Sequence, residues 1–395
     1  MRTTPKPETI PITKIVFGPE ELEAVQRPLE SGWIVQGPYV AEFERRFGEL
    51  VGTPHAVATS SCTTSLHLAA TGLGIRPGDE VVVPAFTWVS TANVVEHLGG
   101  TPVFADIDLE TFNVKPELME AAVTERTVGL IPVHLFGLCA AMDPILDLAR
   151  GRGLWVLEDA ACAFGSAYRG VHAGTLGDAG AFSFHPRKSI TTGEGGMITT
   201  ARDELAALVR SLRDHGATRS DHERHGKEGA FLLSEYPHLG HNFRLTDIQG
   251  ALGCAQLDRA EWILEGRRRA ARRYDEALAD LEWLRTPTVP AGYVHGYQAY
   301  VCLFAPEEPT PANVDALIDR RLRLMERLES RGIATRQGTH APVIQTYYVR
   351  KYGFQPTDFF NAYVADRLTL ALPLYPQLTE SDQERVVDEL RSAFS

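Results

Sequence analysis

The chain has 395 residues, of which 44% are hydrophobic and 23% are charged, a composition typical of a globular enzyme or binding protein. Its formal net charge of −12 argues against nucleic acid or an anionic membrane as the main partner, because both attract clustered lysine and arginine. The length exceeds what one hydrophobic core usually supports, so we expect a large domain over residues 1–260 and a small C-terminal domain over residues 261–395.

Cysteine usage and the N-terminal sequence bear on the compartment. The five cysteines are scattered without C-x-x-C spacing, so neither a disulfide framework nor a zinc site is indicated. Residues 1–7 lack the apolar core of a signal peptide, and no stretch approaches the roughly 20 apolar residues of a membrane span. We therefore expect a cytoplasmic protein.

A helix is predicted to begin after Ser61, because Leu66, Ala69, Ala70 and Leu73 fall at i, i+3, i+4 and i+7 and form one apolar stripe. Between about residues 55 and 200, short apolar runs recur with helical segments between them. Strands that are buried on both faces and separated by helices indicate βαβ units and a parallel sheet. The predicted strands are 80–83, 101–105, 128–133, 154–157, 179–184 and 196–200, with a helix over 140–151.

The pattern changes after about residue 255. A charged helix over 262–281 is predicted to join the two domains, and its arginines at 267–269 are expected to face solvent. The elements predicted beyond it are a strand over 300–304, a helix over 314–331 and a last helix that begins with a capping sequence at Thr379. Residues 216–240, rich in His, Glu, Arg and Gly, are expected to form an exposed binding loop.

The most informative stretch of the sequence surrounds Lys188. This lysine follows an apolar run that ends at Phe184 and precedes the glycine-rich sequence over 193–196. A lysine is usually a solvated surface residue. One held between a strand and a glycine turn is instead expected to be partly desolvated, to lose part of its preference for the charged form, and to act as a nucleophile.

Asp159 follows a buried apolar run and lies 29 positions before Lys188. One interpretation is a helix-capping carboxylate at a strand–helix turn. The other is functional, because ligands of α/β sheets bind at the carboxyl ends of strands. Pyridoxal phosphate (PLP) requires a lysine for a Schiff base and a carboxylate for its pyridine nitrogen. The two residues together therefore predict a PLP site.

Hydroxyl side chains are concentrated at the start of the first predicted helix. Residues 59–65 contain six of them in seven positions, whereas a single N-cap would explain only Ser60 or Ser61. The free N–H groups and the positive dipole end of a helix N-terminus suit a phosphate. Ser183 adds a further hydroxyl close to Lys188, so the sequence predicts that the PLP phosphate binds here.

Four further residues have both a structural and a functional interpretation. Trp88 follows a predicted strand, where an aromatic side chain either belongs to the core or stacks on a cofactor ring. His185 and Glu194 flank the lysine, either as structural hydrogen-bonding groups or as ligand contacts. Arg187 is either a surface charge or a group that steers an anionic substrate.

Several segments of the chain resemble the DegT/StrS family of sugar aminotransferases, and the resemblance extends over nearly the whole length. The segment around Lys188 is the most specific. The matching sequences are SGWIVQGP at 31–38, EDAA at 158–161, FHPRKSITTGEGGM at 184–197, GHNFR at 240–244 and LPLYP at 372–376.

The resemblance implies an α/β fold of the aspartate-aminotransferase-like group, the fold type I PLP enzymes. These enzymes have a mainly parallel seven-stranded sheet in a large PLP-binding domain and a small α+β C-terminal domain. They form homodimers with the active sites at the subunit interface. We therefore expect PLP as the cofactor and a second copy of this chain as a partner.

The resemblance also implies a role for each matching residue, with Lys188 as the Schiff-base lysine and Asp159 as the partner of the pyridine nitrogen. The other implied cofactor contacts are Trp88 and Ala161 at the ring, Cys62, Thr63 and Ser183 at the phosphate, and Asn242 reaching the phosphate from the other subunit. The implied substrate contacts are His185, Arg187, Glu194 and His340.

The chain departs from the family pattern at two cysteines. Cys62 stands where the family usually has glycine, a change that preserves a backbone N–H contact but not a conformation open only to glycine. Cys162 stands where many members carry glutamine or histidine near the ring hydroxyl of the cofactor, and a thiol is a poor replacement for either.

The implied activity is transfer of an amino group from an amino acid, expected to be glutamate, to a keto group of a nucleotide-linked deoxysugar. A keto-cyclitol of an aminoglycoside pathway is an alternative acceptor. PLP-dependent sugar dehydratases of the same fold replace the lysine with histidine, and Lys188 argues against that class. A regulator that only binds PLP would need a DNA-binding module, and the sequence shows no basic helix-turn-helix segment.

Overall fold

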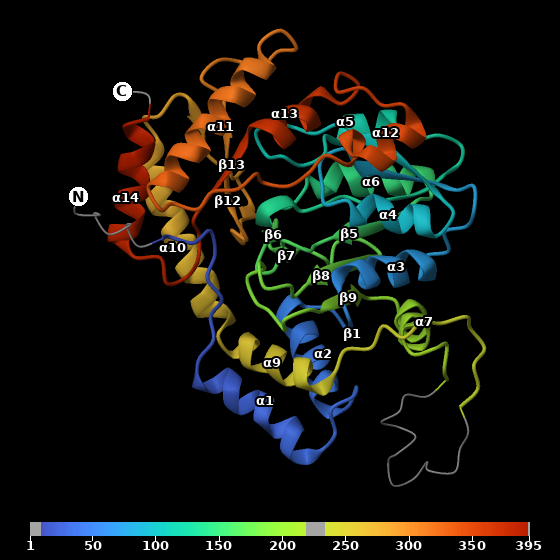
Figure 1. Cartoon of the computed structure of the whole chain (residues 1–395). Helices are drawn as coiled ribbons and strands as arrows, with labels where there is room; N and C mark the ends of the chain where they lie inside the picture. The colour runs from blue at the N-terminus through green and yellow to red at the C-terminus, as the bar shows by residue number, and fades with distance from the viewer. Residues whose placement is uncertain (1–8, 219–233, 394–395) are drawn as a thin grey trace.

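The computed structural model describes residues 9–218 and 234–393 (Figure 1). Most of the predicted 216–240 loop lies outside these ranges. A seven-stranded sheet has the order β1-β9-β8-β5-β4-β2-β3. All of its pairings are parallel except those of β9, which runs antiparallel to β1 and β8. The strands are β1 (His55–Thr59), β2 (Glu80–Pro84), β3 (Thr101–Ala105), β4 (Thr127–Leu130), β5 (Trp155–Asp159), β8 (Ala179–Ser183) and β9 (Gly196–Thr200).

The predicted α/β class and the mainly parallel sheet are confirmed. The apolar runs form strands because the sheet buries both of their faces, and all five residues of β2 and of β9 are buried. The helices of this part of the chain are α1 (Pro19–Ser31), α2 (Pro38–Val51), α3 (Cys62–Gly72), α4 (Ser90–His97), α5 (Pro116–Ala121), α6 (Met142–Arg152), α7 (Asp203–Arg213) and α9 (Asp247–Asp258), with a 3-10 turn η1 (Leu135–Gly137).

Helix α3 begins where the sequence predicts, and its position is set by both local and distant contacts. Ser61 is the N-cap, and its side chain accepts a hydrogen bond from the backbone N–H of Thr64. The helix packs on β8 and β9. Gly196 at the start of β9 permits this approach, because a Cβ atom there would lie 2.4 Å from the carbonyl oxygen of Ser61.

The two N-terminal helices pack against a helix that lies far from them in the sequence. Helices α1 and α2, which the sequence did not predict, both pack against α9 (Figure 1). Asp247 at the start of α9 accepts hydrogen bonds from the backbone N–H groups of Gly37 and Val40, both at 2.9 Å. This contact ties the two N-terminal helices to residues more than 200 positions later in the chain.

The C-terminal part contains an antiparallel sheet of order β10-β12-β13, and Figure 1 shows it beside the large sheet with the last helices around it. A small third sheet has the order β11-β6-β7. The elements are α10 (Ala260–Leu278), β10 (Leu284–Arg285), β11 (Tyr293–Val294), β12 (Tyr300–Phe304), α11 (Val314–Ser330), η2 (Pro342–Ile344), α12 (Thr346–Tyr352), α13 (Phe360–Leu368), β13 (Thr369–Leu372) and α14 (Glu380–Arg391), with β6 (Ala167–Tyr168) and β7 (Val171–His172) from the first half of the chain.

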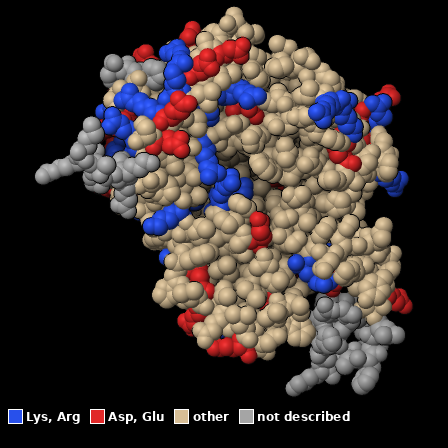
Figure 2. Space-filling view, in the orientation of Figure 1, with Lys and Arg blue, Asp and Glu red and all other residues tan. Residues whose placement is uncertain are grey.

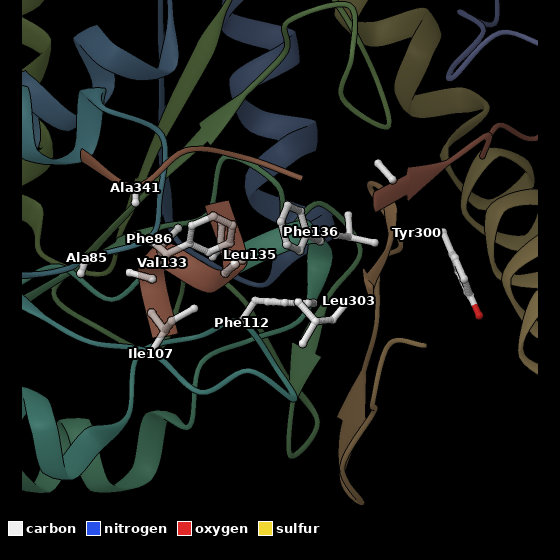
Figure 3. Packing of buried hydrophobic residues seen from close by; sticks show 14 of the residues in the cluster. Ala85, Phe86, Ile107, Phe112, Val133, Leu135, Phe136, Tyr300, Leu303 and Ala341 are labelled. Carbon is white, nitrogen blue, oxygen red and sulfur yellow. The ribbon is translucent and has the colours of Figure 1, made fainter. Parts of the chain in front are cut away.

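A continuous apolar core connects the large sheet to the C-terminal part. Phe86, Phe112 and Phe136 lie together, with ring centroids 5.7 to 6.3 Å apart. Figure 3 shows these rings beside Leu303 of β12. The two parts therefore share buried surface next to the carboxyl ends of the large-sheet strands.

The expectation that the arginines at 267–269 all face solvent is wrong for Arg267. Only 2% of this residue is exposed, and its Nη1 donates to the backbone carbonyls of Tyr297, Gln298 and Leu374. Burial lowers its pKa to about 10. Arg267 thus links α10 to the segments before β12 and after β13, which a periodicity argument over one helix does not reveal.

Charged side chains on the face shown in Figure 2 are interspersed over the C-terminal helices, with both signs present. Arg273 pairs with Glu380 at 2.8 Å, and Arg327 and Arg331 lie 3.8 and 3.6 Å from Glu389. Among the described residues, no helix has the length and apolar character needed to cross a membrane.

Candidate active site

The structure brings Lys188 and Asp159 to the same edge of the large sheet. Strands β5 and β8 are parallel neighbours, and Asp159 pairs with Ala181 near their carboxyl ends. Lys188 follows β8 in a turn in which its N–H donates to the carbonyl of His185 at 2.8 Å. The chain then reverses through Gly193, whose φ of +84° suits glycine.

Asp159 is 3% exposed, and both of its carboxylate oxygens accept hydrogen bonds. Thr91 Oγ1 donates to Oδ2 at 2.7 Å, and the N–H of Ala161 donates to Oδ1 at 3.1 Å. Burial raises the pKa of Asp159, while these two bonds and the charge of Lys188 act in the opposite direction. A cationic partner for this carboxylate would remove the cost of burying it.

The pKa of Lys188 is raised, which corrects the expectation that partial desolvation would lower it. Burial is the largest single influence and does lower the pKa. Cys162 first, and then Asp159, act in the opposite direction, and the net shift is upward. The closest of these groups is Cys162, whose Sγ lies 3.1 Å from Lys188 Nζ. The free lysine is therefore held as an ammonium group.

The start of α3 lies beside this cluster. Cys62 Sγ contacts the carbonyl oxygen of Ala181 on β8 at 3.6 Å, so the first turn of α3 faces the end of β8. The N–H groups of Cys62 and Thr63 have no acceptor within the helix, because the first turn lacks preceding carbonyls. Thr63 is exposed, and Ser183 is half-buried at the end of β8, with its hydroxyl accepting from the N–H of His185 at 3.4 Å.

Trp88 and His340 form an aromatic pair near the same edge. Trp88 is 55% exposed, and its ring centroid lies 5.6 Å from that of His340. The Thr87 N–H donates to the carbonyl of His340 at 2.9 Å, which connects the end of β2 to the segment before η2. His340 Nδ1 also lies 3.9 Å from the buried carboxylate of Asp366.

Three side chains on either side of Lys188 differ in their contacts: His185 and Glu194 lie near each other, whereas Arg187 lines a cavity. His185 Nδ1 accepts from the N–H of Arg187 at 3.2 Å, and His185 Nε2 lies 4.0 Å from Glu194 Oε1. Arg187 is exposed and lines a cavity of about 610 Å³. Other residues that line this cavity include Lys14, Tyr375 and Asp382.

Asn242 is exposed, and its backbone pairs with Asp214 in an isolated bridge. The next carbonyl along the chain, that of Phe243, accepts from the N–H of Ser60 at 2.9 Å. The segment that contains Asn242 therefore lies next to the start of α3 in the same chain.

Sequence reasoning missed two groups that support the site. Thr91 lies on α4, and nothing in its local sequence signals a contact with Asp159. Glu158 is fully buried, and its carboxylate accepts from His134 and from the N–H groups of Gly174, Leu176 and Gly177 at 2.7 to 2.8 Å. The N–H of Ala140 donates to His134 Nδ1, so the imidazole proton is on Nε2, which donates a hydrogen bond to the Glu158 carboxylate. These bonds hold the end of β5 from which Asp159 projects.

This site fits PLP. A buried carboxylate suits a protonated pyridine nitrogen, an amine lies at the adjoining strand end, and the start of α3 offers N–H groups to a phosphate. Together with the sheet topology, these features define a PLP enzyme of fold type I.

Comparison with known proteins agrees with this class. The model of the DegT/DnrJ/EryC1/StrS aminotransferase family matches residues 16–391. The chain belongs to this family and is a PLP-dependent aminotransferase, as the sequence predicts. The spore coat polysaccharide biosynthesis protein SpsC of Bacillus subtilis is 39% identical over 97% of this chain and 96% of its own length.

Two solved structures illustrate the similarity of the fold. The putative sugar aminotransferase Spr1654 of Streptococcus pneumoniae, in its PLP form, is 28% identical with a TM-score of 0.88 over 98% of each chain. Helicobacter pylori PseC, an aminotransferase involved in the biosynthesis of pseudoaminic acid, is 26% identical with a TM-score of 0.88 over 98% of this chain and 99% of its own. These matches confirm the predicted fold type I architecture.

Proposed function

We propose that this enzyme transfers an amino group from an amino acid, glutamate, to a keto group of a nucleotide-linked deoxysugar in amino-sugar biosynthesis. The observation that carries the proposal is the placement of Lys188 and Asp159 at the ends of the parallel strands β5 and β8. The match to SpsC, a spore coat polysaccharide biosynthesis protein, supports a sugar acceptor.

PLP, when bound, supplies an electron-accepting ring that stabilises negative charge on the carbon next to the transferred nitrogen. The Asp159 carboxylate would pair with the pyridine nitrogen and keep that nitrogen protonated, since a buried carboxylate favours a cationic partner. Lys188 would hold the cofactor through its amine. With its amine free, Lys188 would accept a proton at Nζ and return it to the substrate, as general base and acid.

The remaining cofactor contacts are proposed from their positions around these two groups. The N–H groups at Cys62 and Thr63 and the hydroxyls of Thr63 and Ser183 would bind the phosphate, because they lie where α3 meets the end of β8. The exposed ring of Trp88 would cover one face of the pyridine ring, with Ala161 near its edge.

Four residues are proposed to contact substrate. The ring of His340 lies against the exposed ring of Trp88. His185 and Glu194 lie on either side of the lysine turn, with His185 Nε2 4.0 Å from Glu194 Oε1. Arg187 lines a cavity together with Lys14 and Asp382, and its guanidinium group would suit a negative charge of a nucleotide diphosphate.

We also propose a homodimer in which Asn242 reaches the cofactor phosphate of the other subunit, supported by the exposure of its side chain. A cytoplasmic location is proposed because all five cysteines are free thiols, as in proteins of reducing compartments. The division into a large PLP-binding domain over 1–260 and a small domain over 261–395 likewise remains a proposal.

Two experiments test the function. Borohydride reduction of the PLP-loaded enzyme followed by peptide mapping should label Lys188, and a label on any other lysine contradicts the site. An assay with glutamate and a panel of nucleotide keto-sugars and keto-cyclitols should show turnover of the former. Turnover of cyclitols alone would reverse the preference. The Lys188→Ala variant is the control for both experiments.

A further inference from the structure

Cys162 occupies a position that the proposed mechanism leaves without a role. It lies in the turn after β5, three residues beyond Asp159, and the N–H of Ala163 closes that turn on the carbonyl of Ala160 at 2.9 Å. The same turn therefore positions the Asp159 carboxylate and the Cys162 thiol. The Cys162 Sγ lies 3.1 Å from Lys188 Nζ, within hydrogen-bond distance.

We infer that Cys162 is a positioning residue for the reaction, whose sulfur pairs with Lys188 Nζ whenever that amine is not bonded to the cofactor and so sets its place and its protonation. A sulfur accepts a hydrogen bond from an ammonium group as a thiolate or, more weakly, as a thiol. Transamination frees the lysine in every cycle, and the freed amine then accepts a proton and gives it back. An amine held in one place exchanges that proton at a defined position.

The other groups near Lys188 do not take this role. Cys62 contacts the Ala181 carbonyl, and burial raises the pKa of Cys62 well above its usual value, so this thiol stays protonated. The oxygens of Asp159 already accept from Thr91 and Ala161. His185, on the lysine segment itself, is a fourth titratable group near Lys188; its pKa is lowered, chiefly by burial, and it remains neutral at pH 7.

The inference rests on Lys188 as the cofactor lysine, and one arm of the test avoids that dependence. In cofactor-free protein, the rate at which iodoacetamide alkylates Cys162 is measured by mass spectrometry for the wild type and for Lys188→Met. The Lys188 amine lies 3.1 Å from Sγ and activates this sulfur, so Lys188→Met should slow alkylation of Cys162 about tenfold. Cys62 in the same samples is the internal control and should stay unreactive. Equal rates for Cys162 in the two proteins overturn the inference.

The second arm measures how the rate of PLP capture by cofactor-free protein depends on pH, from the absorbance of the lysine-bound cofactor. Because the contact with Cys162 favours the ammonium form, Cys162→Ala should move the midpoint of this profile to lower pH, by about half a unit or more. Cys162→Ser, which keeps a hydrogen-bonding group but forms no anion in this range, should also move it downward. Cys254→Ala is the control for loss of a distant thiol and should leave the midpoint in place.

The outcomes separate the two proposals. If borohydride labels another lysine, the proposed function fails whatever the thiol does. If Lys188 is labelled but neither the alkylation rate of Cys162 nor the pH midpoint responds, only the role of Cys162 is overturned. If both respond and the Cys254 control does not, the sulfur sets the protonation of the free lysine.

Discussion

The hydrogen bond from Thr91 to Asp159 gives a sharp test of how the buried carboxylate is kept charged. Thr91 and Asp159 are both buried, and Oγ1 lies 2.7 Å from Oδ2. Thr91→Val replaces the hydroxyl by a methyl group of similar size and leaves that oxygen without its donor. A hydrogen bond to a charged group contributes about 1.5–3 kcal/mol. The substitution should lower the free energy of unfolding of the cofactor-free protein by about that amount at neutral pH.

The sign of the pH dependence follows from the direction of the pKa shift. Burial raises the pKa of Asp159 in the folded protein above its unfolded value. Its stabilising contribution is therefore present below the unfolded pKa, about 3.9, and is lost as the pH rises through the folded value. Thr91→Val raises the folded pKa further. The difference in unfolding free energy between wild type and variant should be large at pH 7 to 8. It should shrink as the pH falls towards the unfolded pKa, because the folded carboxyl becomes protonated in wild type and variant alike.

Denaturant unfolding of cofactor-free protein across this pH range measures the difference. Thr87→Val is the matched control, because the Thr87 hydroxyl lies 3.0 Å from that of Thr91 and is not bonded to the carboxylate. Its effect should vary little with pH. A loss of stability in Thr91→Val that is the same at both ends of the range would show that the hydroxyl does not stabilise the charged carboxylate, and the reasoning would be refuted.

The other predictions concern catalysis and assembly. Asp159→Asn should keep the fold but slow the single-turnover reaction with glutamate by several orders of magnitude; a rate near that of wild type would leave the carboxylate as a helix cap. Thr63→Ala should raise the dissociation constant of PLP about tenfold, since about 1.4 kcal/mol corresponds to that factor, whereas Thr71→Ala at the far end of α3 should not. Lys188→Ala and Asn242→Asp chains should each be poor enzymes, and their mixed dimer should recover about half of wild-type activity through one intact site. Mixed dimers without recovery would place Asn242 in its own chain's site or outside both sites.

Features that depend on residues close together in the chain could be predicted from the sequence. Alternating apolar runs and helical stretches predicted six of the seven strands of the large sheet, all but β1, because burial on both faces imposes a continuous apolar pattern. Ser61 and Thr379 predicted helix starts, and both side chains accept a backbone N–H in the structure. Lys188 and Asp159 were recognisable because each lies directly after an apolar run, and parallel strands end at a common edge.

The groups that surround Lys188 and Asp159, in contrast, are set by tertiary packing. The contacts of Thr91 with Asp159, of Cys162 with Lys188, and of Arg267 with three distant carbonyls join segments that are 26 to 107 positions apart. No local periodicity carries that information, because which side chains meet is set by how the sheet and helices pack. For the same reason, the pKa of Lys188 moved in the opposite direction from the one expected. Burial alone was foreseeable from the sequence, whereas the sulfur and carboxylate groups that outweigh it come from other strands and turns.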